Sequence, residues 1–97
     1  MNLRQHARGR ACTIRLPGCD GGGETTILAH YRLAGLSGMG IKPDDLACGA
    51  WCCAPCHDKI DGRVKLAGYG RTELRMAHAE GVMRTIEQLR REGLIGK

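Results

Sequence analysis

The chain has 97 residues, a formal net charge of +5, 15 glycines, six cysteines and only three aromatic side chains. This length predicts one domain over residues 1–97, and a core with so few aromatic rings needs an additional source of stability. No apolar run approaches the roughly 20 residues of a membrane span, and the basic N-terminus lacks the apolar segment of a signal peptide. We therefore expect a cytoplasmic protein, in which clustered cysteines indicate metal binding rather than disulfides.

The positive charge is concentrated at the start of the chain. The first 19 residues hold four arginines and no acidic side chain. Such a bias favours a polyanionic partner, of which nucleic acid is the commonest. The alternative is a solvated surface with a modest excess of positive charge.

The first half of the chain predicts short elements separated by glycine. Residues 3–10 are expected to form a short basic helix, and the alternation in Cys12–Leu16 is typical of a short strand. A second strand is predicted over Thr25–Tyr31, where β-branched residues gather. The glycines at 35, 38 and 40 indicate a loop over residues 34–42.

The second half predicts a strand between helices. Pro43–Leu46 is expected to be a turn or a helix start, and Gly49–Cys53 a further strand. Pro55–Gly62 predicts a short helix that glycine could end. Apolar residues at helical spacing predict a C-terminal helix over about 71–92, although Gly81 would weaken it. The core is expected over about residues 10–65.

The strongest local motif is Cys53-Ala-Pro-Cys56, directly followed by His57. Two cysteines at this spacing can place both thiolates on one tetrahedral zinc ion. Cys12 and Cys19 supply a second pair across a Pro-Gly turn. These four cysteines are the predicted structural zinc ligands, and the bound ion would stabilise a core poor in aromatic residues.

Cys48 and Cys52 are left over from this set. Cys52 could compete with Cys53 as a ligand, and Cys48 could be a small buried apolar residue. Two other interpretations of the cysteines remain. Six free thiols require no metal, and disulfides require an oxidising compartment. Attachment of haem to Cys53, Cys56 and His57 would require export and a large apolar pocket, which the sequence does not indicate.

Three further side chains form a candidate hydrolytic site. His30 ends the predicted strand, while His57 and Asp61 stand four residues apart and would share one helix face. If zinc fixes the start of that helix, the face is directed toward His30. A divalent metal on His57 and Asp61, with His30 as general base, would suit phosphodiester hydrolysis. The alternatives are a structural histidine at 30 and an ordinary surface pair on the helix; His6 and His78 are expected at the surface.

Taken together, the motifs resemble those of the YbcO-like nuclease family of lambdoid phages and prophages. The resemblance runs from Arg4 to about Gly70 and is carried by four segments. These are Cys12…Cys19, Leu28-Ala-His-Tyr-Arg32, Gly38-Met-Gly-Ile-Lys-Pro-Asp-Asp45 and Cys53-Ala-Pro-Cys-His-Asp58. More distantly, the chain is similar to the HNH, or ββα-metal, endonucleases. The resemblance implies a bacterial host and a small α+β fold: a zinc-stapled treble-clef, HNH-like core with a C-terminal helix.

The same resemblance assigns roles to single residues. It implies that His30 is the general base, that His57 is a ligand of the catalytic metal and that Asp61 stands where a further ligand is often found. Many relatives have Asp or His at the position of Ala29. Their middle asparagine has its nearest counterpart in Asp45 or the neighbouring Asp44. Arg32 could contact the scissile phosphate; otherwise it is an ordinary surface arginine.

Three functions follow from these features. The first is a metal-dependent endonuclease that hydrolyses DNA phosphodiester bonds in phage DNA processing or recombination, with structural Zn²⁺ and a catalytic cation such as Mg²⁺. The second is a zinc-stapled nucleic-acid-binding module with weak or no catalysis, which Ala29 and the absent asparagine favour. The third is an adaptor that binds a partner through its C-terminal helix. DNA is the expected partner, with a homodimer or a recombination protein as further candidates.

Overall fold

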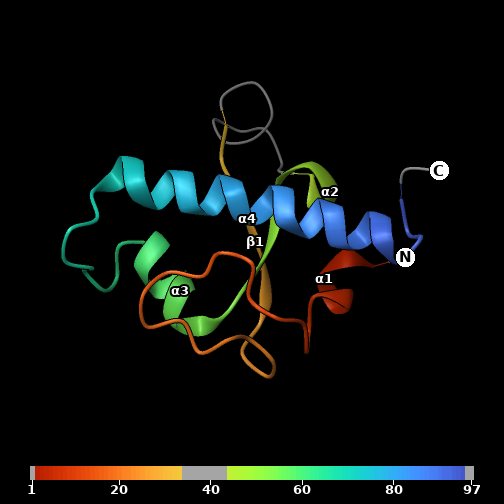
Figure 1. Ribbon diagram of the computed structural model, residues 1–97, viewed down its shortest axis with the longest axis horizontal. Coiled ribbons are helices and arrows are strands. Elements are labelled where there is room, and N and C mark those ends of the chain that lie inside the picture. Colours follow the sequence, from red (N-terminus) through yellow and green to blue (C-terminus); the bar gives the residue numbers. More distant parts are fainter. Residues whose placement is uncertain (1, 34–43, 96–97) are drawn as a thin grey trace.

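The computed structural model describes residues 2–33 and 44–95. The protein is a small, compact α+β structure in which one long helix crosses a two-stranded sheet (Figure 1). Its elements, in chain order, are α1 (Leu3–His6), β1 (Ile27–His30), α2 (Asp45–Cys48), β2 (Gly49–Cys52), α3 (Ala54–Ile60) and α4 (Arg71–Arg91). The glycine-rich loop predicted over residues 34–42 lies outside the described residues.

The sheet is an antiparallel pair of β1 and β2. Leu28 stands opposite Trp51, and His30 stands opposite Gly49 at the end of the pair. All four residues of β2 are buried, whereas β1 shows a partly exposed pattern. Both strands lie within the segments that the sequence predicts. The pairing places His30 at the end of the sheet, in its last residue pair.

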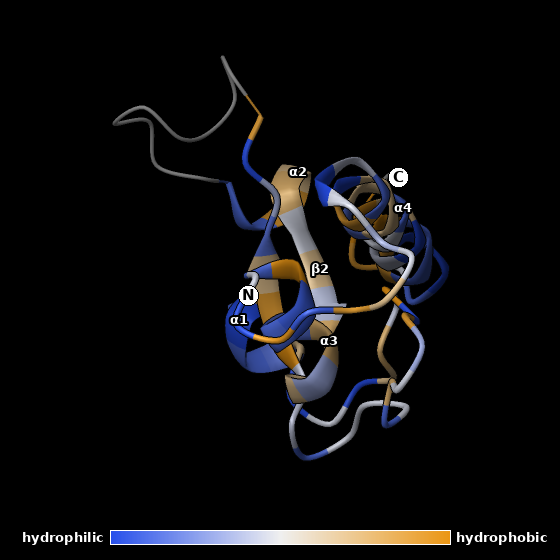
Figure 2. Ribbon diagram, turned by 90° about the vertical axis from the view of Figure 1, so that its left-hand side faces the viewer, coloured by the Kyte–Doolittle hydropathy of each residue, from blue (hydrophilic) through white to orange (hydrophobic). Residues whose placement is uncertain are grey.

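Helix α4 packs along β2 and runs unbroken through Gly81. A Cβ atom at this position would lie 2.8 Å from Cγ1 of Ile14 and 3.4 Å from Cβ of Ala50. Glycine therefore allows the helix to approach the strand closely, which offsets its low helix propensity. Figure 2 looks along α4 and shows its apolar residues on the side facing β2.

A buried network of polar groups joins α4 to β2. The Thr85 hydroxyl accepts a hydrogen bond from the backbone N–H of Trp51 at 3.0 Å and lies 2.9 Å from the Thr13 hydroxyl. Thr13 in turn donates its hydroxyl and its backbone N–H to the carbonyl oxygen of Trp51. The N–H and carbonyl groups of Trp51 that face away from β1 are thus satisfied without a third strand, as buried backbone groups require.

The strand predicted over Cys12–Leu16 is wrong. The backbone N–H of Thr13 bonds to Trp51, but the chain then turns away because Arg15 adopts a left-handed φ of 61°. The regular pairing in this region is a single bridge between Ala11 and Gly22. The turn brings Cys19 back toward Cys53, with their Sγ atoms 3.6 Å apart.

Helix α3 follows β2 directly and is fixed at both ends. Pro55 occupies its first turn, and the carbonyl oxygen of Cys53 accepts the backbone N–H of His57 at 2.9 Å. Asp61 is the C-terminal cap, and Gly62 follows with a φ of 80°.

In the part of the chain that is described, no helix is both long and apolar enough to cross a bilayer.

Candidate active site and metal centre

Four cysteines from two distant segments form one cluster. The Sγ atoms of Cys12, Cys19, Cys53 and Cys56 all lie within 4.8 Å of one another. Four sulfurs around a zinc ion at about 2.3 Å are separated by about 3.8 Å, so the cluster has the size of a tetrahedral site. Cys12, Cys53 and Cys56 are buried and Cys19 is half-buried. This set could hold a metal such as zinc.

The pKa values of these thiols indicate that they cannot all be deprotonated together without a cation. A hydrogen bond from Cys52 lowers the pKa of Cys12 to about 3, whereas burial raises the pKa of Cys53 to about 11. Burial likewise raises the pKa of Cys56. Sulfurs packed this closely cannot all be thiolates unless a positive charge stands among them. A divalent ion would supply that charge.

The remaining two cysteines have different surroundings. Cys52 is fully buried in β2, and its thiol contacts Cys12 and the carbonyl oxygen of Cys53 at 3.4 Å. The Cys12 contact and its burial raise the pKa of Cys52, so it stays a neutral thiol beside the cluster. Cys48 is buried at the end of α2. Cys52 therefore lies beside the proposed ligands, and Cys48 fits the role of a small apolar residue.

His30 is held by a carboxylate from the segment after the undescribed loop. Its Nε2 lies 2.7 Å from Oδ1 of Asp45, and the His30 side chain is only 16% exposed. The hydrogen bond from His30, assisted by Arg4, lowers the pKa of Asp45, which therefore stays ionised at neutral pH. An ionised carboxylate only accepts, so Nε2 carries the proton and Nδ1 is left as the basic nitrogen. The neighbouring Asp44 instead caps α2 by accepting the backbone N–H of Ala47 at 2.9 Å.

His57 and Asp61 meet on one face of α3, as their spacing predicts. Nε2 of His57 lies 3.3 Å from Oδ2 of Asp61, and Arg63 donates to Nδ1 of His57 at 3.0 Å. Arg63 also approaches Asp61 at 3.1 Å. A metal ion on Nε2 and the carboxylate would displace the shared proton and weaken the Arg63 contacts.

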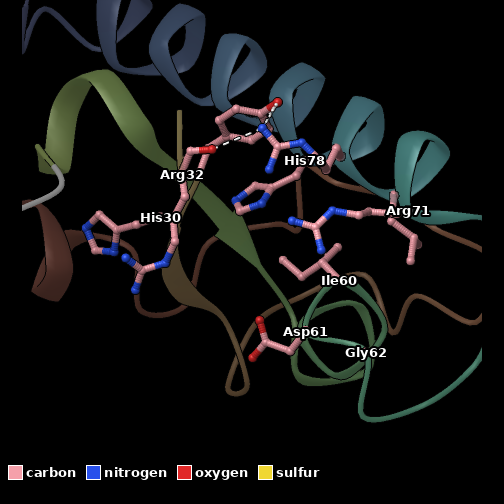
Figure 3. Close-up of a pocket in the computed structure, with 10 residues that line it drawn as sticks. His30, Arg32, Ile60, Asp61, Gly62, Arg71 and His78 are labelled. Atoms are coloured by element: carbon pink, nitrogen blue, oxygen red, sulfur yellow. Dashed lines mark hydrogen bonds between the residues drawn. The ribbon is translucent and has the colours of Figure 1, made fainter. Parts of the chain in front are cut away.

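A pocket of about 500 Å³ lies between the end of β1, the end of α3 and the start of α4 (Figure 3). It contains two of the predicted catalytic residues, His30 and Arg32, together with Asp61. In Figure 3 the His30 ring lies at one side, apart from Asp61 and His78. The described lining residues are His30, Tyr31, Arg32, Ile60, Asp61, Gly62, Arg71, Leu74, Arg75 and His78.

The expectation that His78 is a surface residue is wrong. His78 lines the pocket, its Nε2 lies 3.0 Å from the carbonyl oxygen of Ala29, and its ring packs edge-on against Tyr31. Burial lowers the pKa of His78, so it is neutral at pH 7. His6 contacts Glu92 at 3.0 Å.

The sequence alone does not mark Arg71 and Arg75 as residues of this pocket. They stand four residues apart in the first turns of α4, on the face that also presents His78 to the pocket. Their spacing is visible in the sequence. The position of that helix face beside His30 depends on the packing of α4 across β2.

The sequence matches the family described as "Putative nuclease YbcO" over residues 1–94. The chain belongs to the YbcO family. It is 46% identical over 97 residues to "Putative nuclease YbcO" of Escherichia coli (strain K12), covering 97% of this chain and 96% of that protein. The values are the same for "Putative nuclease ybcO" of Enterobacteria phage 82.

A solved structure supports the fold of this YbcO-family chain. It is described as "Structure of a putative bacteriophage protein" from Escherichia coli str. K-12 substr. MG1655. The two chains share 38% identity and superpose with a TM-score of 0.75, over 95% of this chain and 100% of the other. The arrangement described above therefore has a counterpart among solved structures.

Proposed function

We propose that this YbcO-family protein is a metal-dependent, HNH-like endonuclease that hydrolyses phosphodiester bonds in DNA. One observation carries the proposal: His30, which contacts Asp45, lines an arginine-rich pocket together with Asp61, which itself contacts His57. The names of the relatives support a hydrolase acting on nucleic acids. A relative encoded by phage 82 supports a role in phage DNA processing or recombination.

The scaffold of the proposed enzyme is a treble-clef zinc site. The order of the elements supports this proposal: a loop that carries Cys12 and Cys19 is followed by two antiparallel strands and by a helix that begins beside Cys53 and Cys56. Zn²⁺ on the four thiolates would fix the start of α3. That restraint would hold His57 and Asp61 in place relative to β1.

His30 is proposed to act as the general base. Asp45 holds the protonated Nε2, which leaves Nδ1 to accept a proton from the attacking water. The ionised Asp45 would also stabilise the imidazolium that results from this transfer. Asp45 thus takes the place of the middle asparagine of the HNH pattern and orients the base.

His57 and Asp61 are proposed to hold the catalytic cation. An imidazole nitrogen and a carboxylate are both suitable ligands for a divalent metal, and Mg²⁺ commonly completes its shell with water and substrate phosphate. When bound, such a cation stabilises negative charge on the phosphate and the leaving oxygen. Arg32, on the wall of the pocket, would contact the scissile phosphate.

One observation favours the alternative of a nucleic-acid-binding module without catalysis. Arg63 contacts both His57 and Asp61, so the two proposed ligands are already satisfied by a protein cation. Ala29 also offers no additional ligand from β1. A module of this kind would bind DNA in a salt-dependent manner but would not cleave it.

Plasmid nicking with and without Mg²⁺ or Mn²⁺ separates these two functions. The endonuclease should nick only with added metal, and Asp61→Asn should require a higher metal concentration for the same rate, because a neutral amide is a weaker ligand. Asp58→Asn is the matched control on the same helix, since Asp58 pairs with Arg63 at 3.1 Å and is not a proposed ligand. Salt-dependent DNA binding with no nicking under any metal would favour the binding module instead.

A further inference from the structure

We propose that Arg71 and Arg75 of α4 bind a backbone phosphate of the DNA strand and seat it beside the catalytic residues. This inference rests on the proposed endonuclease function and adds its substrate-binding element. It assigns α4, which is required for packing against β2, a second role in recognition.

Arg75 is held rigidly and keeps donors that no described residue uses. Its Nη2 donates to the Tyr31 hydroxyl at 2.9 Å and to the carbonyl oxygen of Arg32 at 3.0 Å, and the guanidinium lies 4.6 Å from the centre of the Tyr31 ring. These two bonds use both hydrogens of Nη2. Nε and Nη1 keep three N–H groups in a fixed plane, an arrangement suited to a phosphate.

Arg71 contributes a charge that the described protein does not neutralise. It is exposed in the first turn of α4, and no described residue forms a hydrogen bond or ion pair with it. Figure 3 shows its side chain extending from α4 into the region between His78 and Asp61. A cation at a helix N-terminus opposes the helix dipole, so this position does not favour arginine for stability.

The charge balance of the pocket also favours an anion. Arg32, Arg71 and Arg75 line it, and Asp61 is the only acidic residue among the described lining. Asp61 is already paired with Arg63 at 3.1 Å. The pocket therefore carries an excess of positive charge of the kind that attracts and holds a phosphate.

The position of this phosphate is set by rigid parts of the fold. Arg75 is bonded to the residues that follow β1, and Tyr31 is itself fixed by a backbone bond to Cys48 at 2.8 Å. The Thr85 network anchors the same helix to β2. A phosphate on Arg71 and Arg75 would thus be held at a constant position relative to His30.

Binding of a fluorescent DNA duplex, measured by anisotropy over a series of KCl concentrations without added Mg²⁺ or Mn²⁺, tests the inference. Arg71→Gln should weaken binding about tenfold and reduce the slope of log K against log salt by about 1, because one phosphate contact is lost. Its Tm should equal or exceed that of the parent, because a cation leaves the helix N-terminus. Arg71→Lys should keep the parental slope.

Arg8→Gln is the matched control. Arg8 is exposed beside α1, and Figure 1 shows α1 near the C-terminal end of α4, opposite the start of that helix. This change removes the same charge and should leave the salt slope unchanged. Equal effects of Arg71→Gln and Arg8→Gln would overturn the inference. Since binding is measured without metal, a parent that binds but never nicks would contradict the endonuclease function alone.

Discussion

Two regions of the molecule, its buried half and its open half, differ in what their side chains do. One half holds the cysteine cluster and the contact of α4 with β2, where the groups are buried and satisfied by one another. The other half is the open pocket, which is lined by three arginines, two histidines and Asp61. Buried polar groups contribute stability only when they are paired, whereas exposed charges contribute little to it. The first half should therefore determine folding and the second half activity.

The largest effect is expected from the cysteine cluster. Cys56→Ala should abolish zinc binding and cooperative thermal unfolding, because structural zinc supplies about 10–16 kcal/mol in small domains, as much as their whole stability. Elemental analysis and a thermal melt measure both results. Cys48→Ala, a buried cysteine outside the cluster, should keep about one equivalent of zinc. A Cys56→Ala protein that folds without zinc would contradict the claim that the cysteine cluster determines folding.

Asp45→Ala should affect activity more than the fold. It removes the side chain that orients His30, so nicking should fall on the order of 10²-fold, a loss within the usual contribution of general base catalysis. Asp44→Asn, at the neighbouring position, is the control, since asparagine caps helices as well as aspartate. Equal nicking rates for the two variants would exclude Asp45 from the site.

Thr85→Val should lower stability and leave activity unchanged. It leaves the buried N–H of Trp51 without an acceptor and should lower the free energy of unfolding by about 1–3 kcal/mol, with nicking retained. Urea denaturation measures the change. Thr72→Val, an exposed position on the same helix, should stay within about 0.5 kcal/mol of the parent. A loss of nicking in a folded Thr85→Val protein would show that the contact of α4 with β2 also controls activity, which contradicts the separation of the two halves.

The smallest effect concerns the pH dependence of stability. Because burial lowers the pKa of His78, the unfolded chain takes up the proton first as the pH falls below about 6.5. The native state therefore loses stability on the acidic side of that value and not above it. Tm measured at pH 7.5 and 5.5 should fall less in His78→Gln than in the parent, at equal zinc content. Parallel declines would mean that His78 titrates normally.

Features that depend on local spacing could be predicted from the sequence. The Cys53–Cys56 spacing, the strand before His30 and the periodicity of α4 each express one short-range rule, and the structure contains all three elements. The predicted i, i+4 contact of His57 with Asp61 also exists. These are contacts that a single helix or strand determines.

Features that depend on long-range packing could not be predicted. The segment after Cys12 alternates like a strand, yet closing the cysteine cluster requires a turn at Arg15. Gly81 weakens a helix in isolation, but in the fold it permits close contact with β2. His78 and Arg71 needed the placement of α4 beside His30, since helical periodicity shows which residues share a face but not what that face meets.

The nicking rate of His30→Ala, measured beside the parent at matched zinc content, tests the central claim most directly. His30 belongs to the pocket and not to the metal cluster, so this variant should bind zinc and melt like the parent. We expect its metal-dependent nicking to fall at least on the order of 10²-fold, because the general base is removed. Equal nicking by the two proteins would contradict both the role of His30 and the placement of the chemistry in this pocket.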